Sequence, residues 1–263
     1  MNIYNLKTIE YPNGSAQIRI YHDPVGYDGS KEPKEFEIEP FTGKKILRTV
    51  NSFDELIINR LNAREKSLAR TRAKINTYAR CMRWEWFCTF TYSPEKNDRT
   101  DFSECMAKLR NWLQNIRKRN APDLAFLAVP ELHRDMITWH AHLLMSCTGN
   151  LQFEDSGRRA AGQIIYNISG WRWGFSTATK VIDTYKIQKY ICKYLTKECH
   201  LMSKGAHRYY VSNNLPAPKE SIMCVESTEQ ENTIQQIVES LGMEITYRSE
   251  VKGYIDVTYI ELK

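Results

Sequence analysis

Two histidines one residue apart are the residues best suited to chemistry. His140 and His142 lie in the apolar run Trp139–Met145, which predicts a β-strand. Because side chains alternate along a strand, both imidazoles would lie on one face, close enough to bind one ion. The motif is weak on its own, since it is equally typical of two histidines on a solvated strand face.

Glu131 could add a third ligand to these histidines. It follows the expected strand Ala125–Pro130, and a hairpin with the next strand would bring its carboxylate beside the two imidazoles. Three protein ligands leave coordination positions open for a substrate, as a catalytic metal requires. The mixed oxygen and nitrogen donors suit Mn²⁺ or Mg²⁺ acting on a phosphate. The alternative is a strand-end carboxylate in water.

A candidate nucleophile lies in the expected helix Thr184–Cys199. Tyr190, Lys193, Tyr194 and Lys197 recur at the spacing of one helix face. A phenol, with a pKa of about 10, is a poor nucleophile near neutral pH, and neighbouring ammonium groups favour the phenolate. We expect Tyr190 to attack first, because it begins the doubled motif nearer the helix start. The alternative is an amphipathic helix with tyrosines at the margin of the core.

Threonines alternate with aromatic residues in the expected strand Trp84–Tyr92. This pattern is typical of a central strand, and it would place Thr89 and Thr91 on the face opposite Phe90. We expect both hydroxyls to lie near bound DNA.

Positive charge is concentrated in one segment of a chain whose net charge is +6. Residues 60–83, most of which belong to an expected helix over residues 53–80, hold eight bases and one acid. Residues 225–263 hold eight acids and three bases. The asymmetry indicates a polyanionic partner for the body of the protein, although a solvated basic helix would look the same. We expect four of the bases to bind DNA phosphates: Arg70, Arg72, Lys74 and Arg80.

The order of the expected elements predicts an α+β fold. Residues 101–119 are expected to form an amphipathic helix, but few helices separate the strands and hairpins are frequent. This favours a central antiparallel sheet of about five strands with flanking helices. The chain divides into an extension, residues 1–59, a main domain, residues 60–215, and an acidic helix-hairpin appendage, residues 216–263.

Composition indicates the compartment. The 263 residues carry seven scattered cysteines without a CxxC pair, no apolar run long enough for a membrane span, and no signal peptide. We therefore expect a cytoplasmic protein without a membrane partner.

Together the motifs resemble those of the HUH endonucleases, the rolling-circle replication initiators. The strand Phe87–Tyr92 resembles their first motif, His140-Ala141-His142 with Glu131 their second, and Tyr190–Lys197 their third. The doubled tyrosine is similar to that of phage and plasmid initiators. One departure is Ala141, since a bulky apolar residue is common between the two histidines.

The resemblance implies a five-stranded antiparallel sheet of the HUH/RRM type, a Mn²⁺ or Mg²⁺ ion and a covalent 5′-phosphotyrosine. The implied substrate is single-stranded DNA at a replication origin hairpin. Because the sequence has no Walker A motif, a host helicase would unwind the DNA and a host polymerase would extend the nick. Two alternatives stay open: a relaxase or transposase with the same chemistry, and a non-catalytic DNA-binding or repressor module.

Overall fold

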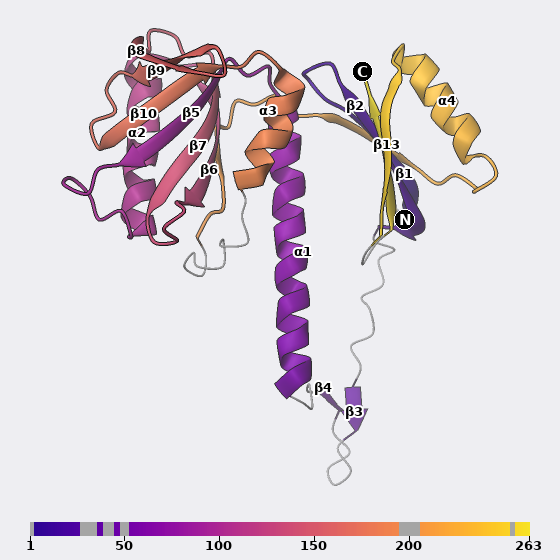
Figure 1. Ribbon diagram of the computed structural model, residues 1–263. Coiled ribbons are helices and arrows are strands. Elements are labelled where there is room, and N and C mark those ends of the chain that lie inside the picture. The colour runs from indigo at the N-terminus through magenta and orange to yellow at the C-terminus, as the bar shows by residue number, and fades with distance from the viewer. Residues whose placement is uncertain (1–2, 27–35, 39–44, 48–52, 195–205, 253–255) are drawn as a thin grey trace. The chain divides into compact units, whose positions relative to one another are not determined.

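The computed structural model describes residues 3–26, 36–38, 45–47, 53–194, 206–252 and 256–263. The chain forms two compact units (Figure 1). We call Arg70–Ala217 the central unit, and we call Met1–Ala69 with Pro218–Lys263 the terminal unit. The boundary between them falls within the helix α1 (Phe53–Arg80), whose bounds agree with the expected helix.

The central unit is built on one antiparallel sheet. Its strands are β5 (Trp86–Tyr92), β6 (Ala125–Leu132), β7 (Trp139–Ser146), β8 (Phe153–Ala160), β9 (Gln163–Ile168), β10 (Gly174–Lys180) and β11 (Tyr210–Val211). They lie in the order β11-β6-β7-β5-β10-β9-β8. The α+β class is thus confirmed, and the sheet has seven strands where we expected about five. The β8–β9 hairpin extends one edge and β11 the other, and these polar or very short strands lack the alternation that predicts a strand.

One face of this sheet is covered by α2 (Phe102–Arg119), as Figure 1 shows. Asp101 caps the helix by accepting hydrogen bonds from the backbone N–H groups of Ser103 and Glu104, an arrangement that contributes about 1 kcal/mol. The apolar stripe of α2 packs on alternate residues of the central strands. The fully buried members include Leu109 and Leu113 on the helix and Phe90, Ala141 and Leu143 on the sheet. Because α2 takes this face, the residues between them along each strand point to the opposite face.

A second helix of the central unit is shorter than expected. α3 (Thr184–Ile191) begins at the predicted residue, and the side chain of Asp183 caps it through the N–H of Lys186. A single 3₁₀ turn, η1 (Cys192–Tyr194), then replaces the α-helix. The remainder of the expected helix, including Lys197 and Cys199, lies outside the described residues.

The terminal unit joins the two ends of the chain in a second antiparallel sheet. Its strands are β1 (Tyr4–Glu10), β2 (Ala16–Val25), β12 (Lys219–Met223), β13 (Ile245–Val251) and β14 (Val257–Leu262), in the order β12-β1-β2-β14-β13. The helix α4 (Gln230–Leu241) packs on one face. The core between them consists of Leu6, Ala16, Ile18, Ile20, Ile234, Val238, Ile260 and Leu262. A separate pair of short strands, β3 (Phe36–Ile38) and β4 (Lys45–Leu47), lies between β2 and α1 in the sequence.

This arrangement differs from the three consecutive segments drawn from the sequence. Residues 1–59 and 216–263, treated there as separate appendages, share one sheet, because β1 pairs with β12 and β2 pairs with β14. Each of these segments alone would leave an apolar strand face in water, and pairing buries it. Local patterns predict strands but do not identify which distant strands pair. Among the helices that the structure describes, none is both long and apolar enough to cross a bilayer.

Candidate active site

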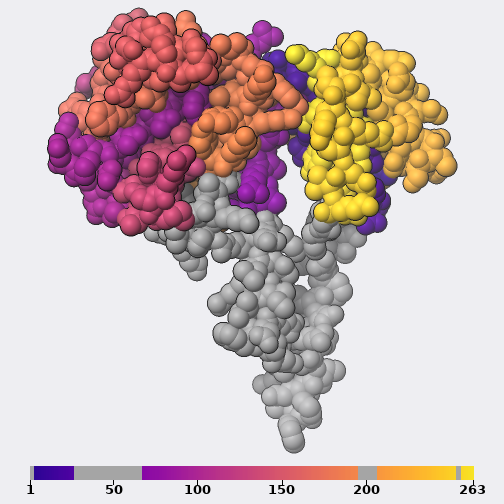
Figure 2. All heavy atoms as spheres, in the orientation of Figure 1, coloured from indigo at the N-terminus to yellow at the C-terminus, as the bar shows by residue number. Residues whose placement is uncertain are grey.

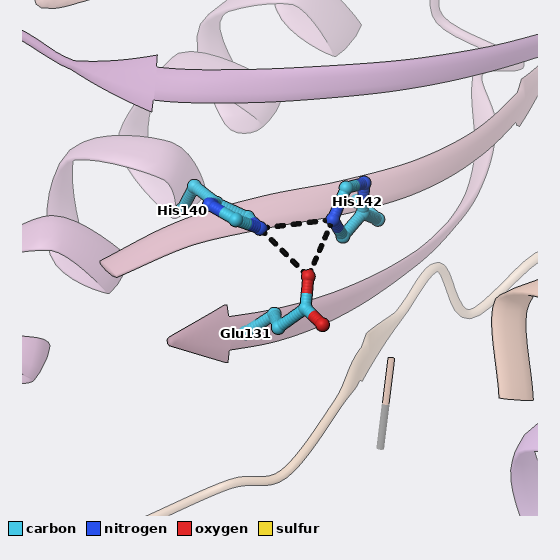
Figure 3. A group of neighbouring side chains, drawn as sticks. All are labelled: Glu131, His140 and His142. Carbon is cyan, nitrogen blue, oxygen red and sulfur yellow. Dashed lines mark hydrogen bonds and ion pairs between the residues drawn. The ribbon is translucent and has the colours of Figure 1, made fainter. Parts of the chain in front are cut away.

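Three side chains predicted from the sequence converge on the uncovered face of the central sheet (Figure 3). β6 and β7 form a hairpin in which Glu131 lies directly opposite His140, and His142 follows on the same face. Glu131 Oε2 lies 2.8 Å from His140 Nε2 and 2.9 Å from His142 Nε2. The two Nε2 atoms are themselves 2.9 Å apart. We call Glu131, His140 and His142 the metal triad.

The triad lies near an open edge of the sheet, and Pro130 contributes to that. β11 pairs only with Leu127 and Ala128 of β6. At Pro130 the strand therefore has no described neighbour on that side, and the missing proline N–H costs no ladder hydrogen bond. The adjacent Glu131 is half-buried, so its carboxylate is held by the hairpin while a ligand can still approach it.

The geometry of the triad fits a small divalent cation. Two ligands at right angles around an ion at about 2.1 Å would lie about 3.0 Å from each other. The three measured separations, 2.8 to 2.9 Å, agree with that value. One carboxylate and two imidazoles occupy three positions of an octahedron, so open positions face the solvent side of the sheet.

The protonation of the triad favours metal binding. Burial acts to raise the pKa of Glu131, but hydrogen bonds with His140 and His142 outweigh it and lower the pKa to about 2. Burial lowers the pKa of His142, and the hydrogen bond to Glu131 only partly opposes this. At neutral pH Glu131 is therefore a carboxylate and His142 a neutral imidazole, the forms that coordinate an ion.

Two residues of β5 hold His142 in place. Thr89 Oγ1 lies 3.0 Å from His142 Nδ1. If Nε2 binds an ion, the proton sits on Nδ1 and is donated to Thr89, which fixes the tautomer and the ring. The ring of Phe87 stacks on His142 at 5.6 Å between centroids. We expected Thr89 to face DNA, and it does lie on the open face, but its hydroxyl contacts the metal triad. The hydroxyl–aromatic alternation placed both residues on this face without indicating which contacts they make.

The two tyrosines of the doubled motif lie beside the metal triad at different depths. The ring of Tyr194 stacks on His142 with 3.5 Å between centroids and 20° between planes. Tyr190 lies farther out, 42% exposed, with its ring 5.4 Å from Phe87 and 5.1 Å from Tyr194. Burial raises the pKa of Tyr194, and a hydrogen bond with Tyr190 and the charge of Glu131 raise it further. Tyr194 is therefore a neutral phenol in this structure.

The lysines of the doubled motif are placed less completely. Lys193 is exposed, and its Nζ lies 5.6 Å from the centre of the Tyr190 ring. Such a contact keeps a positive charge beside the phenol. Lys197 lies outside the described residues.

The expected DNA-binding bases of α1 divide into two groups. Arg70, Arg72 and Lys74 are exposed. Arg80 is only 3% exposed, because the last turn of α1 packs into the central unit, where the indole N–H of Trp84 donates to the Ala79 carbonyl. In this structure the guanidinium of Arg80 is thus out of reach of a bound strand, and we leave it out of the proposed interface.

A pocket of about 490 Å³ adjoins the metal triad on the side of His140. Apart from the expectation for Thr91, no sequence pattern indicated it, because its residues come from three separate segments. They are Thr91, Arg99, His133, Arg134, Asp135, Thr138, Trp139 and His140. Thr91 therefore lies at a hollow beside the triad, as a DNA contact would require. Figure 2 shows the outer surface of the described units, with the uncertain residues in grey.

Comparison with known proteins identifies the central part of the chain. Residues 85–199 match the family of the replication-associated protein ORF2. Comparisons with curated proteins and with solved structures gave no match. The matched range contains the metal triad and both tyrosines, so the residues that converge in the structure all lie within it. Through residues 85–199 this chain thus belongs to the ORF2 family of replication-associated proteins, a family of rolling-circle replication initiators.

Proposed function

We propose that this protein nicks and rejoins single-stranded DNA at a replication origin and so starts rolling-circle replication. The observation that carries the proposal is the stacking of Tyr194 on His142, which brings a candidate nucleophile against three convergent metal ligands. A metal site next to a tyrosine is the arrangement that phosphoryl transfer to a phenol requires. The family match supports the replication role.

The reaction is a transesterification. A tyrosine oxygen bonds to the scissile phosphorus, the bond from phosphorus to the 3′ oxygen breaks, and that oxygen takes up a proton. The products are a 5′-phosphotyrosine and a free 3′-hydroxyl that can prime synthesis. A Mn²⁺ or Mg²⁺ ion held by Glu131, His140 and His142 would polarise the scissile phosphate. Rejoining reverses the reaction when a 3′-hydroxyl attacks the phosphotyrosine.

Two tyrosines allow two successive attacks in one site. Position in the sequence favours Tyr190 for the first attack, whereas the contact with His142 favours Tyr194. We propose that the two alternate, because their rings touch and both lie against Phe87. Lys193 and Lys197 would neutralise charge on the phosphate during these steps.

The strand would be held by positive charge outside the site. We propose that Arg70, Arg72 and Lys74, which are exposed on α1, bind phosphates of the single strand. Host helicase and polymerase would supply unwinding and synthesis, and the reaction would take place in the cytoplasm.

A nicking assay tests the proposal. Candidate origin oligonucleotides are incubated with the protein and Mn²⁺, and covalent adducts are mapped by peptide mass spectrometry. We expect a single cut and an adduct on Tyr190 or Tyr194, both lost in the His140→Ala, His142→Ala double variant. Binding without cleavage would instead indicate a non-catalytic DNA-binding or repressor module. Cutting at transfer or transposon ends in place of a replication origin would indicate a relaxase or transposase.

A further inference from the structure

An exposed phenylalanine lies in line with the metal triad across the sheet. In the register of the strands, Glu131 lies opposite His140, and His140 lies opposite Thr91. Thr91 in turn lies opposite Phe175 of β10. Directly paired residues share a face of the sheet, so Phe175 is on the same face as the metal triad. Its side chain is 77% exposed.

We propose that Phe175 is a stacking platform for a base of the single-stranded substrate, and that the pocket beside Thr91 binds the strand's phosphate next to that base. This inference rests on the proposed function, because it takes the scissile phosphate to lie at the metal triad. It adds a binding subsite that determines how the strand crosses the sheet.

The spacing of strands sets the distance to the scissile phosphate. β10 is two strands away from β7, and neighbouring strands lie about 4.8 Å apart, so Phe175 is about 10 Å from His140 along the row. Stacked nucleotides advance by about 3.4 Å each. The base on Phe175 would therefore lie within about three nucleotides of the scissile phosphate.

Phe175 is exposed but firmly positioned. The preceding Gly174 lies so close to the β5 backbone that an added Cβ would overlap the Thr91 carbonyl oxygen. The carbonyl of Trp173 accepts hydrogen bonds from the Ser93 N–H at 2.8 Å and from the side chain of Asn97 at 2.6 Å. A rigid aromatic ring loses little conformational entropy on binding, which favours its use as an anchor.

The pocket beside Thr91 supplies the positive charge that a phosphate needs. Arg99 and Arg134 line it, and within the described part of the chain neither forms an ion pair. The carboxylate of Asp135 also lines it, but it accepts hydrogen bonds from the Thr138 hydroxyl and from the Ile137 and Thr138 N–H groups. These bonds hold Asp135 in its own loop, so the two guanidinium groups face the pocket.

The neighbours of Phe175 favour a nucleic acid over a protein as its occupant. Across β5 and β10, the adjoining residues on this face are Thr91, Thr89 and Thr177, so the ring is not part of an apolar patch of the kind that protein interfaces use. An aromatic ring beside a basic groove is the combination that binds single strands without sequence preference.

Binding of a fluorescent oligo(dT) strand, followed by anisotropy without metal, separates the two parts of the subsite. We expect Phe175→Ala to lower affinity about tenfold with an unchanged salt dependence, and Phe175→Trp to keep it. The Arg99→Gln, Arg134→Gln double variant should lower affinity and also flatten the salt dependence, because fewer counterions are released. Tyr247→Ala is the matched control: this aromatic residue of the terminal unit is 52% exposed, and its loss should leave affinity unchanged.

The outcomes distinguish this inference from the proposed function. Unchanged binding by Phe175→Ala, or an equal loss in Tyr247→Ala, overturns the stacking platform even if the wild-type protein nicks DNA. An unchanged salt dependence in the arginine double variant overturns the phosphate pocket. If the wild-type protein fails to nick any origin strand while Phe175→Ala still weakens binding, the nicking proposal fails and the stacking platform stands.

Discussion

At the scale of single residues, the metal triad depends on a neighbour that binds no metal. His142 can present Nε2 to an ion only if its ring keeps one orientation and one tautomer. The hydroxyl of Thr89 provides both constraints through Nδ1. The triad could be predicted from residue types and spacing, because a strand places alternate residues on one face. The contact of Thr89 could not, because it depends on the register between β5 and β7.

Removing that hydroxyl should weaken the site without unfolding it. We expect Thr89→Val to lower the affinity for Mn²⁺ by about 10- to 100-fold, the usual effect of losing such an outer partner. Isothermal titration calorimetry measures it. Thr177→Val, on the same face but exposed, serves as the control. Equal Mn²⁺ affinity in Thr89→Val and wild type would show that Thr89 does not orient His142.

The pKa of His142 provides a second test at this scale. Because burial lowers it, an NMR titration of the metal-free protein should place its midpoint below the usual value of about 6.5. Glu131→Gln should move the midpoint lower still, since the hydrogen bond from the carboxylate raises it. As the pH falls below about 6.5, the unfolded chain takes up a proton that folded His142 does not, so metal-free stability should decrease. A midpoint above 6.5 would contradict this account.

At the scale of elements, the change from α3 to η1 decides which tyrosine lies deeper. The sequence predicts one continuous helix over residues 184–199, with Tyr190 and Tyr194 on one face. In the structure the α-helix ends at Ile191 and a 3₁₀ turn carries Tyr194 onto His142. Helix start and apolar spacing could be predicted from local signals. The early end could not, because the contact of Tyr194 with the sheet is a tertiary one that local propensity does not encode.

This element makes a prediction about the covalent adduct. We expect Tyr194→Phe to reduce adduct formation more than Tyr190→Phe, because Tyr194 contacts the metal triad directly. Each single variant should retain some adduct on its remaining tyrosine, and the double variant should form none. Mass spectrometry of trapped adducts measures all three. An adduct found only on Tyr190 in the wild-type protein would restore the order of attack favoured by the sequence, and persistence in the double variant would contradict both assignments.

Elements without alternating patterns were the hardest to predict from the sequence. α1, α2 and the strands of the triad hairpin follow clear apolar spacing and agree with expectation to within about two residues at most ends. The strand β8 has a single large apolar residue, Phe153, whose ring stacks on Trp86 at 3.9 Å. Such a strand forms because it pairs with β9, so its own sequence does not indicate it.

At the scale of the whole molecule, the chain is organised as one unit inserted into another. The central unit, Arg70–Ala217, is a single stretch, and the terminal unit is assembled from the residues on both sides of it. The acidic segment 225–263 belongs to the terminal unit, whereas the exposed bases Arg70, Arg72 and Lys74 belong to the central unit. The separation of charge noted in the sequence therefore follows the boundary between units.

The two units should respond separately to core substitutions. Ile18 is fully buried in the terminal core, so Ile18→Asp, which buries a charge, should unfold the terminal unit. Mn²⁺ binding at the metal triad should persist, because all three ligands lie in the central unit. Limited proteolysis with mass spectrometry identifies the unit that opens, and Arg19→Lys on the opposite strand face is the mild control. Simultaneous loss of both units would show that they fold as one.

The order in which a ribosome makes the chain gives the inserted arrangement a consequence in time. Gln17 of β2 bonds to Glu261 of β14, 244 positions later. Strands β1 and β2 therefore emerge early and wait for their partners until synthesis is almost complete, while the stretch 70–217 already contains every strand of its own sheet. The segment bearing the metal triad can thus fold on the nascent chain. The terminal sheet closes only as the last strand emerges, so translation itself sets the sequence in which the two units form.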